Sequence, residues 1–171
     1  VFQHAIAVDP HHANTLGNYA LFLQNQKGDT GQAQIIFQQA IEADPHDASN
    51  LGDYALFLHT IVNDTDQAET MYKRAIDADP HNANNLGAYA TFLKNIRGDM
   101  DQAQNMYQQA INADPHDARN LGNYAYFLFT VRHDMDQAQD MYQQAIDLDP
   151  HDAPTLGGYA LFLHTVRGDM D

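Results

Sequence analysis

The 171-residue chain is acidic, with 23 Asp and Glu residues against 8 Lys and Arg residues and a formal charge of −15 at pH 7. Because binding to nucleic acid or to an anionic membrane depends on cationic side chains, this charge argues against both partners and favours an apolar or basic protein. Apolar residues make up 44% of the chain, enough for a buried core, and the absence of cysteine excludes disulfides and thiolate metal sites.

No apolar run reaches the roughly 18 to 20 residues that a membrane-spanning helix needs, and the first residues do not resemble a signal peptide. A chain without cysteine suits oxidising and reducing compartments alike, so the sequence leaves the localisation open, with the cytoplasm as the default.

The chain is built from a repeat of 35 residues. Its Asp-Pro pairs lie at Asp9-Pro10, Asp44-Pro45, Asp79-Pro80, Asp114-Pro115 and Asp149-Pro150. A Leu-Gly-x-Tyr-Ala-x-Phe-Leu phrase and a Gln-Ala-x-x-x-(Phe/Tyr)-x-x-Ala-Ile phrase return at the same interval. Three phrases with one period predict a single array over residues 1–171.

The array divides at the Asp-Pro pairs. It has a half repeat at 1–10, full repeats at 11–45, 46–80, 81–115 and 116–150, and a half repeat at 151–171. Because Val1 lies inside a repeat, we expect the chain to be a fragment of a longer protein. The terminal half repeats also predict head-to-tail self-association, in which Phe2, Ala5 and Ile6 of one molecule pack near Tyr159, Phe162 and Leu163 of the next.

Each repeat predicts two helices. In the first full repeat, the apolar residues at helical spacing are Leu16, Tyr19, Ala20 and Leu23, then Ala33, Phe37, Ala40 and Ile41. Pro45 ends the second helix, because proline cannot continue a helix and keeps the preceding residue extended. The predicted N-caps of the next first helices are His12, Asp47, Asn82, Asp117 and Asp152.

The turn between the two helices is also predicted. Asp29, Asp64, Asp99 and Asp134 each precede a glutamine by three residues, which is the spacing of a capping box. Gly, Asn or His stands before each of these aspartates and before Asp169, and these residue types accept a positive φ most readily. The first helices are therefore expected to end in a left-handed residue at Gly28, Asn63, Gly98, His133 and Gly168.

These residues resemble the tetratricopeptide repeat, whose pattern is W-x2-L-G-x2-Y, then A-x3-F, A and P. Ala33, Phe37, Ala40 and Pro45 match its second helix, whereas Leu16, Tyr19, Ala20 and Leu23 replace the Trp, Leu, Gly and Tyr of its first. One extra residue is expected between the helices. The resemblance covers the whole chain and implies an all-α, right-handed superhelical solenoid of antiparallel helix hairpins.

A second family is close. The first helix of the half-a-TPR repeat is similar to Tyr19-Ala20-Leu21-Phe22, and that family builds scaffolds for RNA processing. Pentatricopeptide repeats share the 35-residue period, but they read RNA, which the acidic charge disfavours.

No catalytic constellation stands out among the polar residues. His46, His81, His116 and His151 recur one repeat apart, too far apart to share one metal ion, and are interpreted as surface residues. The recurring glycines lie inside helices and form no phosphate-binding loop. We therefore expect no enzyme activity, no cofactor and no metal.

The resemblance implies that the first helices line a concave groove that binds a peptide or helix of a partner protein. The residues expected in this groove are Asn14, Gly17, Leu21, Gly52, Leu56, His59, Gly87, Thr91, Lys94, Arg119, Gly122, Tyr126, Phe129, Leu161 and His164. The glycines either allow close approach of neighbouring helices or leave room for a ligand backbone. The alternatives to a binding scaffold are a self-assembling structural solenoid and a scaffold in an RNA-processing complex.

Overall fold

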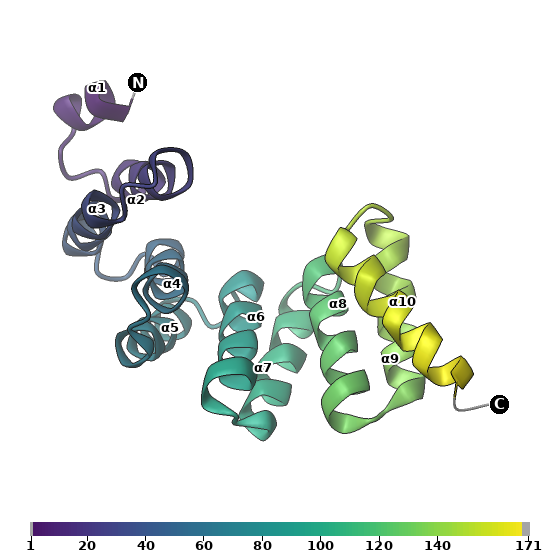
Figure 1. Cartoon of the computed structure of the whole chain (residues 1–171). Helices are drawn as coiled ribbons and strands as arrows, with labels where there is room; N and C mark the ends of the chain where they lie inside the picture. The colour runs from purple at the N-terminus through teal and green to yellow at the C-terminus, as the bar shows by residue number, and fades with distance from the viewer. Residues whose placement is uncertain (1, 169–171) are drawn as a thin grey trace. The chain divides into compact units, whose positions relative to one another are not determined.

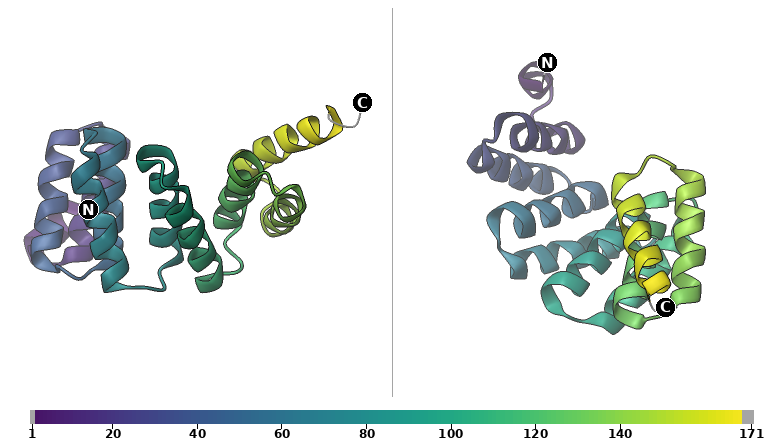
Figure 2. Two further views of the ribbon diagram at one scale, coloured as in Figure 1. Left: turned by 90° about the horizontal axis from the view of Figure 1, so that it is seen from below. Right: turned by 45° about the vertical axis from the view of Figure 1, so that its right-hand side comes forward.

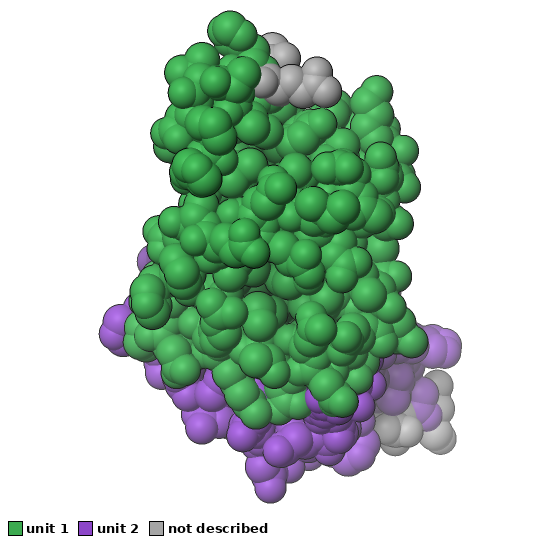
Figure 3. All heavy atoms as spheres, turned by 90° about the vertical axis from the view of Figure 1, so that its left-hand side faces the viewer, with its two compact units in different colours: residues 1–80 green, residues 81–171 purple. Residues whose placement is uncertain are grey.

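The computed structural model of the protein describes residues 2–168. This part of the chain contains ten α-helices and four π-helical turns and no strand. It forms two compact units, Val1–Pro80 (unit 1) and His81–Asp171 (unit 2), shown in different colours in Figure 3. The boundary falls between two repeats, directly after an Asp-Pro pair.

Unit 1 contains a single helix followed by two helix hairpins (Figure 1). Its elements are α1 (Phe2–Val8), α2 (Ala13–Phe22), η1 (Leu23–Lys27), α3 (Thr30–Ala43), α4 (Ala48–Phe57), η2 (Leu58–Val62) and α5 (Thr65–Ala78). The paired helices α2 and α3, like α4 and α5, lie side by side, and α2 also contacts α4.

Unit 2 contains two further hairpins and a last helix (Figure 2). Its elements are α6 (Ala83–Phe92), η3 (Leu93–Arg97), α7 (Met100–Ala113), α8 (Ala118–Phe127), η4 (Leu128–Arg132), α9 (Met135–Leu148) and α10 (Ala153–Gly168). Here α8 contacts the first helices on both sides, α6 and α10. The predicted all-α repeat of helix hairpins is confirmed, while the handedness of a superhelix stays a prediction.

The Asp-Pro pairs separate the hairpins as the sequence predicts. Asp44 ends α3 in an extended conformation (φ −139°), and its carboxylate accepts a hydrogen bond from the N–H of His46 (3.0 Å). The next helix is capped by Asp47, which accepts from the N–H groups of Ser49 and Asn50. His12 also serves as a cap, since its Nδ1 accepts from the N–H of Thr15 (3.2 Å).

The extra residue of the 35-residue period does not lie between the helices. In the four hairpins the first helix ends in a π-helical turn, whose wider i→i+5 bonding accommodates one more residue than an α turn. Left-handed residues then end these turns, as predicted, at Gly28, Asn63, Gly98 and His133, with φ between 56° and 69°. Gly168 differs, because it is the last residue of α10 and has no positive φ.

The predicted capping box forms in one direction only. The carboxylate of Asp29 accepts from the N–H of Gln32 (3.1 Å), and the equivalent contact recurs in the other three hairpins. The N–H of Asp29, however, donates to the carbonyl of Leu23 (3.2 Å) and closes the left-handed turn. The glutamine side chain is therefore not needed at this N–H.

The core between successive hairpins is a cluster of three aromatic rings. Phe37 of α3 lies 5.5 Å from Tyr54 and 5.4 Å from Phe57 of the next first helix, measured between ring centroids. Phe2 makes the same contacts with Tyr19 and Phe22, so α1 occupies the place of a second helix. Tyr107 and Tyr142 make them in unit 2, and both are fully buried.

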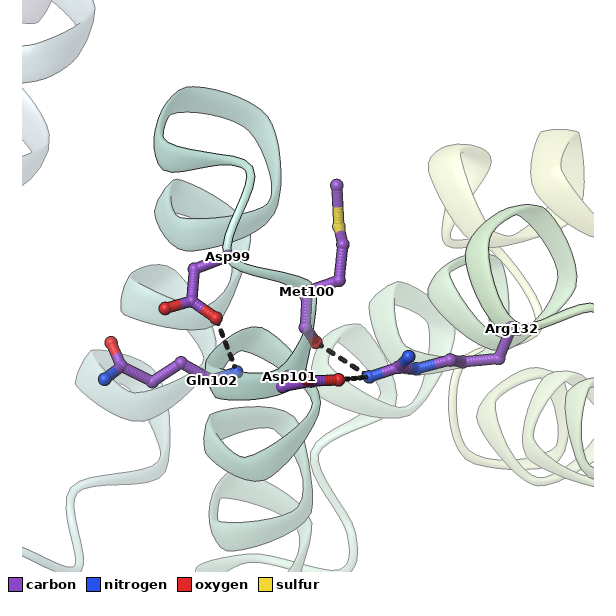
Figure 4. Close-up of polar contacts among 5 residues, drawn as sticks. All are labelled: Asp99, Met100, Asp101, Gln102 and Arg132. Atoms are coloured by element: carbon purple, nitrogen blue, oxygen red, sulfur yellow. Dashed lines mark hydrogen bonds and ion pairs between the residues drawn. The ribbon is translucent and has the colours of Figure 1, made fainter.

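A polar contact joins the two hairpins of unit 2. The guanidinium of Arg132, at the end of η4, donates to the carboxylate of Asp101 (2.6 Å) and to the carbonyl of Met100 (3.2 Å) at the start of α7 (Figure 4). Asp99 caps the same helix end through Gln102. Because Asp101 is almost fully exposed, this ion pair contributes little to stability.

Candidate functional site

The first helices carry a row of residues at 35-residue intervals. This row, here called the outer row, consists of Leu21, Leu56, Thr91, Tyr126 and Leu161. Three of them are large and exposed, with exposed fractions of 44% for Leu56, 39% for Tyr126 and 48% for Leu161. Leu21 and Thr91 are half-buried. Each unit therefore presents apolar side chains on the faces that the family resemblance assigns to a groove.

The second row of the predicted groove consists of Gln24, His59, Lys94, Phe129 and His164. Phe129 was expected in the groove, but it is buried, with an exposed fraction of only 7%. The ring packs edge-on against Phe162 of α10, with centroids 5.5 Å apart. Phe129 therefore belongs to the core of unit 2, whereas His164 is exposed.

Two residues of the second row are held by neighbours in their own units. The ammonium of Lys94 lies 5.0 Å from the ring centroid of Tyr126, a cation–π contact between α8 and the end of the preceding first helix. Burial lowers the pKa of Lys94. In unit 1, Nδ1 of His59 lies 3.2 Å from the hydroxyl of Tyr72, and burial lowers the pKa of this imidazole.

Thr91 points toward the second helix of its own hairpin. Its hydroxyl bonds to the carbonyl of Gly87 (3.0 Å) and lies 3.0 Å from the hydroxyl of Tyr107. It is thus a structural member of the outer row. The remaining predicted groove residues, Asn14 and Arg119, are exposed, and Asn14 accepts a hydrogen bond from the amide of Asn18 (2.7 Å).

The recurring glycines are explained by close packing between first helices. Gly17, Gly52, Gly87 and Gly122 are buried. A Cβ at Gly17 would collide with the amide oxygen of Asn50 in the next first helix, and one at Gly87 with that of Asn120. At Gly122 the obstacle is Thr155. These contacts favour close helix approach over room for a ligand backbone as the reason for the glycines.

The Asn residues at these contacts are themselves fixed. Asn120 donates to the carbonyl of Ala83 in the preceding first helix (3.0 Å) and to the carboxylate of its own N-cap, Asp117 (3.1 Å). Asn50 donates likewise to Asp47 (3.0 Å). The glycine and the asparagine together set the spacing of the first helices within each unit.

Residues with catalytic or metal-binding side chains are dispersed. His46, His81, His116 and His151 are exposed. Within residues 2–168, no group of three His, Asp or Glu side chains is arranged to hold a metal ion. Among the same residues, no helix is long and apolar enough to cross a bilayer.

Part of the predicted head-to-tail contact is already occupied within the molecule. Phe162 is 1% exposed, against Tyr142 and Phe129, and Phe2 contacts Tyr19 and Phe22. These two rings are therefore not free for a neighbouring molecule in the way the sequence suggests. Self-association itself stays a prediction.

One pocket was not foreseen from the sequence. It lies in unit 2 between α8, α9 and α10, and the buried Tyr142 is one of its lining residues. The signal was present in the repeat, because Tyr126, Phe129 and Gly158 depart from Thr91, His59 and Asn123 at the equivalent positions. Without the structure, however, these three substitutions could not be placed around a single phenol.

Two sequence models of the tetratricopeptide repeat match the chain, one at residues 13–47 and the other at residues 62–119. The chain belongs to the tetratricopeptide repeat family. The half-a-TPR features of its first helices stay a prediction. A search of curated proteins by sequence finds no match.

Solved tetratricopeptide proteins share the fold. pilF of Pseudomonas aeruginosa is 21% identical, with a TM-score of 0.80 over 92% of this chain and 70% of its own. A thermophilic TPR protein of Thermus thermophilus is 17% identical, with a TM-score of 0.76 over 95% and 87%. YrrB, described as a TPR protein with an unusual peptide-binding site, is 17% identical, with a TM-score of 0.69 over 98% and 84%.

Proposed function

We propose that this tetratricopeptide repeat chain is a non-enzymatic scaffold that binds a peptide or helix of a partner protein on the exposed faces of its first helices. The observation that carries the proposal is the outer row, where Leu56, Tyr126 and Leu161 expose apolar surface at equivalent positions. In unit 2, Tyr126 and Leu161 lie on the contacting first helices α8 and α10, a spacing that suits alternating side chains of a bound segment.

Charge favours a particular kind of segment. The chain carries 23 acidic and 8 basic residues, so a peptide with Lys or Arg beside its apolar residues meets an attractive field. The peptide-binding site of YrrB, a protein with the same fold, supports peptide binding as a use of such an array.

The proposal is tested by selecting peptides from a random displayed library against the 171-residue chain. Selected peptides are then measured against Leu56→Ser and against Ile35→Ser, a matched control in the second helix α3. Both residues are large, aliphatic and similarly exposed, at 44% and 49%. Loss of an apolar contact at the centre of an interface weakens binding about tenfold or more.

We expect Leu56→Ser to weaken binding by about this factor and Ile35→Ser to leave it unchanged. The opposite ranking would place the binding surface on the second helices. Failure to select any peptide that binds the folded chain would also contradict the proposal.

A further inference from the structure

Tyr107 and Tyr142 occupy equivalent positions in the second helices of the two hairpins of unit 2, but their hydroxyl groups have different environments. In the first, the hydroxyl of Tyr107 lies 3.0 Å from the Thr91 hydroxyl. In the second, Tyr142 is fully buried, yet its hydroxyl has no hydrogen-bond partner among the described residues. A buried polar group without a partner is costly, so this hydroxyl calls for an explanation.

The substitutions around Tyr142 account for the missing partner. Thr91 is replaced by Tyr126, whose ring faces outward beneath Lys94. The position of His59, which bonds the equivalent Tyr72, is held by Phe129. Neither replacement offers Tyr142 a hydrogen bond within its own hairpin.

A pocket of about 200 Å³ lies beside Tyr142. Its lining residues are Gly122, Asn123, Tyr126, Tyr142, Pro154, Thr155 and Gly158. Gly158 replaces the Asn123 of the preceding hairpin, and a Cβ there would lie only 2.8 Å from the Tyr142 hydroxyl. The glycine therefore leaves the space beside this hydroxyl without a side chain.

The lining selects an uncharged polar group. None of the seven described lining residues carries a charge, so a carboxylate or ammonium entering the pocket would lose its hydration without gaining a counter-ion from the lining. Burial raises the pKa of Tyr142, so the phenol is protonated at neutral pH and can donate. Asn123 adds a carboxamide, and Tyr126 and Pro154 supply apolar walls.

We infer that this pocket binds an amide group of the partner segment, with the Tyr142 hydroxyl donating to the amide oxygen and Asn123 pairing with the amide. The amide comes either from a Gln or Asn side chain or from the peptide backbone. The inference rests on the proposed function, because Gly122 and Tyr126 of the pocket belong to the predicted groove.

The experiment titrates the 171-residue chain with the N-acetyl N-methylamides of glutamine, leucine and glutamate, of which only the glutamine compound has a primary carboxamide, and follows the backbone NMR signals. A pocket for side-chain amides gives saturable shifts at Gly122, Asn123 and Gly158 with the glutamine compound alone. A pocket for backbone amides gives them with all three compounds, because each carries the same two backbone amides. No shifts at these residues, or shifts that do not saturate, overturn the inference.

Three variants identify the donor. Tyr142→Phe removes only the hydroxyl and should weaken binding of the amide about tenfold. Tyr107→Phe makes the same change in the preceding hairpin and should leave binding unchanged. Tyr126→Thr introduces the residue that Thr91 provides for Tyr107 in the preceding hairpin. The new threonine should give Tyr142 a hydrogen-bond partner within the protein and abolish binding of the amide. Undiminished binding by Tyr142→Phe or Tyr126→Thr overturns the inference.

The selected library peptides separate this inference from the proposed function. If Leu56→Ser weakens them and Tyr142→Phe does not, the groove stands and the amide pocket is refuted. If no peptide binds but the glutamine compound still binds in a Tyr142-dependent way, the pocket stands and the groove is refuted.

Discussion

One aromatic residue recurs in the second helix of each hairpin, and the group next to the para position of its ring differs between the hairpins. Phe37 needs no hydrogen bond, Tyr72 lies beside the imidazole of His59, and Tyr107 lies beside the hydroxyl of Thr91. Tyr142 has no such partner in the described chain. Residues of the outer row and of the second row thus decide whether the hydroxyl is satisfied.

Removal of one hydroxyl from each tyrosine should therefore have unequal effects. Tyr107→Phe breaks a hydrogen bond to Thr91 and should lower the free energy of unfolding by about 1 kcal/mol. Tyr142→Phe removes a buried hydroxyl without a partner and should leave the free energy unchanged or raise it slightly. Urea unfolding followed by circular dichroism measures both, and equal losses would show that Tyr142 is satisfied in the free protein.

The recurring glycine of the first helices should also respond differently to substitution at different positions. Gly87→Ala places a Cβ against Asn120, which must move away from the Ala83 carbonyl, so it should cost about 1 to 3 kcal/mol. Gly157 occupies the equivalent position in α10 with open space at its Cβ, so Gly157→Ala should stabilise by about 0.5 to 1 kcal/mol. Thermal unfolding distinguishes them, and stabilisation by both would refute the close-packing account.

Among the elements, the end of the first helix was predicted in part. The sequence indicated its left-handed residue but not its π-helical turn. The exchange of Gly28, Asn63, Gly98 and His133 at one position indicated a left-handed residue, and the backbone has one there. The π-helical turn was missed, because it changes hydrogen-bond partners along the backbone without a distinctive side chain. The extra residue was therefore expected in the loop.

This turn can be tested by exchange between hairpins. A non-glycine residue with positive φ is strained, so His133→Gly should stabilise unit 2 by up to about 1 kcal/mol. Gly98→Ala places a Cβ at φ 69° and should destabilise it by about 1 kcal/mol. Matched urea unfolding curves measure the pair, and a destabilising His133→Gly would mean that the imidazole makes a contact worth more than the strain.

The candidate site was predictable to the extent that repeat spacing identifies helix faces. Spacing placed Leu56, Tyr126 and Leu161 correctly on an exposed face. It misplaced Phe129, because burial of that ring depends on Phe162 of a helix one repeat further along. Contacts between hairpins are set by three-dimensional packing, which a period alone does not encode.

At the scale of the whole molecule, the formal charge of −15 bears on the choice of partner. Electrostatic attraction to a basic segment is screened by salt, with a Debye length of about 10 Å at 0.1 M and about 3 Å at 1 M. Selected peptides should therefore contain Lys or Arg and bind more weakly as salt is raised, chiefly through slower association. Stopped-flow association rates measured across a salt series check this, and acidic or salt-insensitive peptides would contradict it.

We propose that the partner lies along the first helices and contacts Tyr142 of the second helix α9 beside them. Hydrogen–deuterium exchange of the 171-residue chain, free and saturated with a selected peptide, tests it most directly. We expect added protection in α4, α8 and α10, which carry Leu56, Tyr126 and Leu161, with α3, α5 and α7 little changed. Protection concentrated in those second helices, with the first helices unaffected, would contradict it.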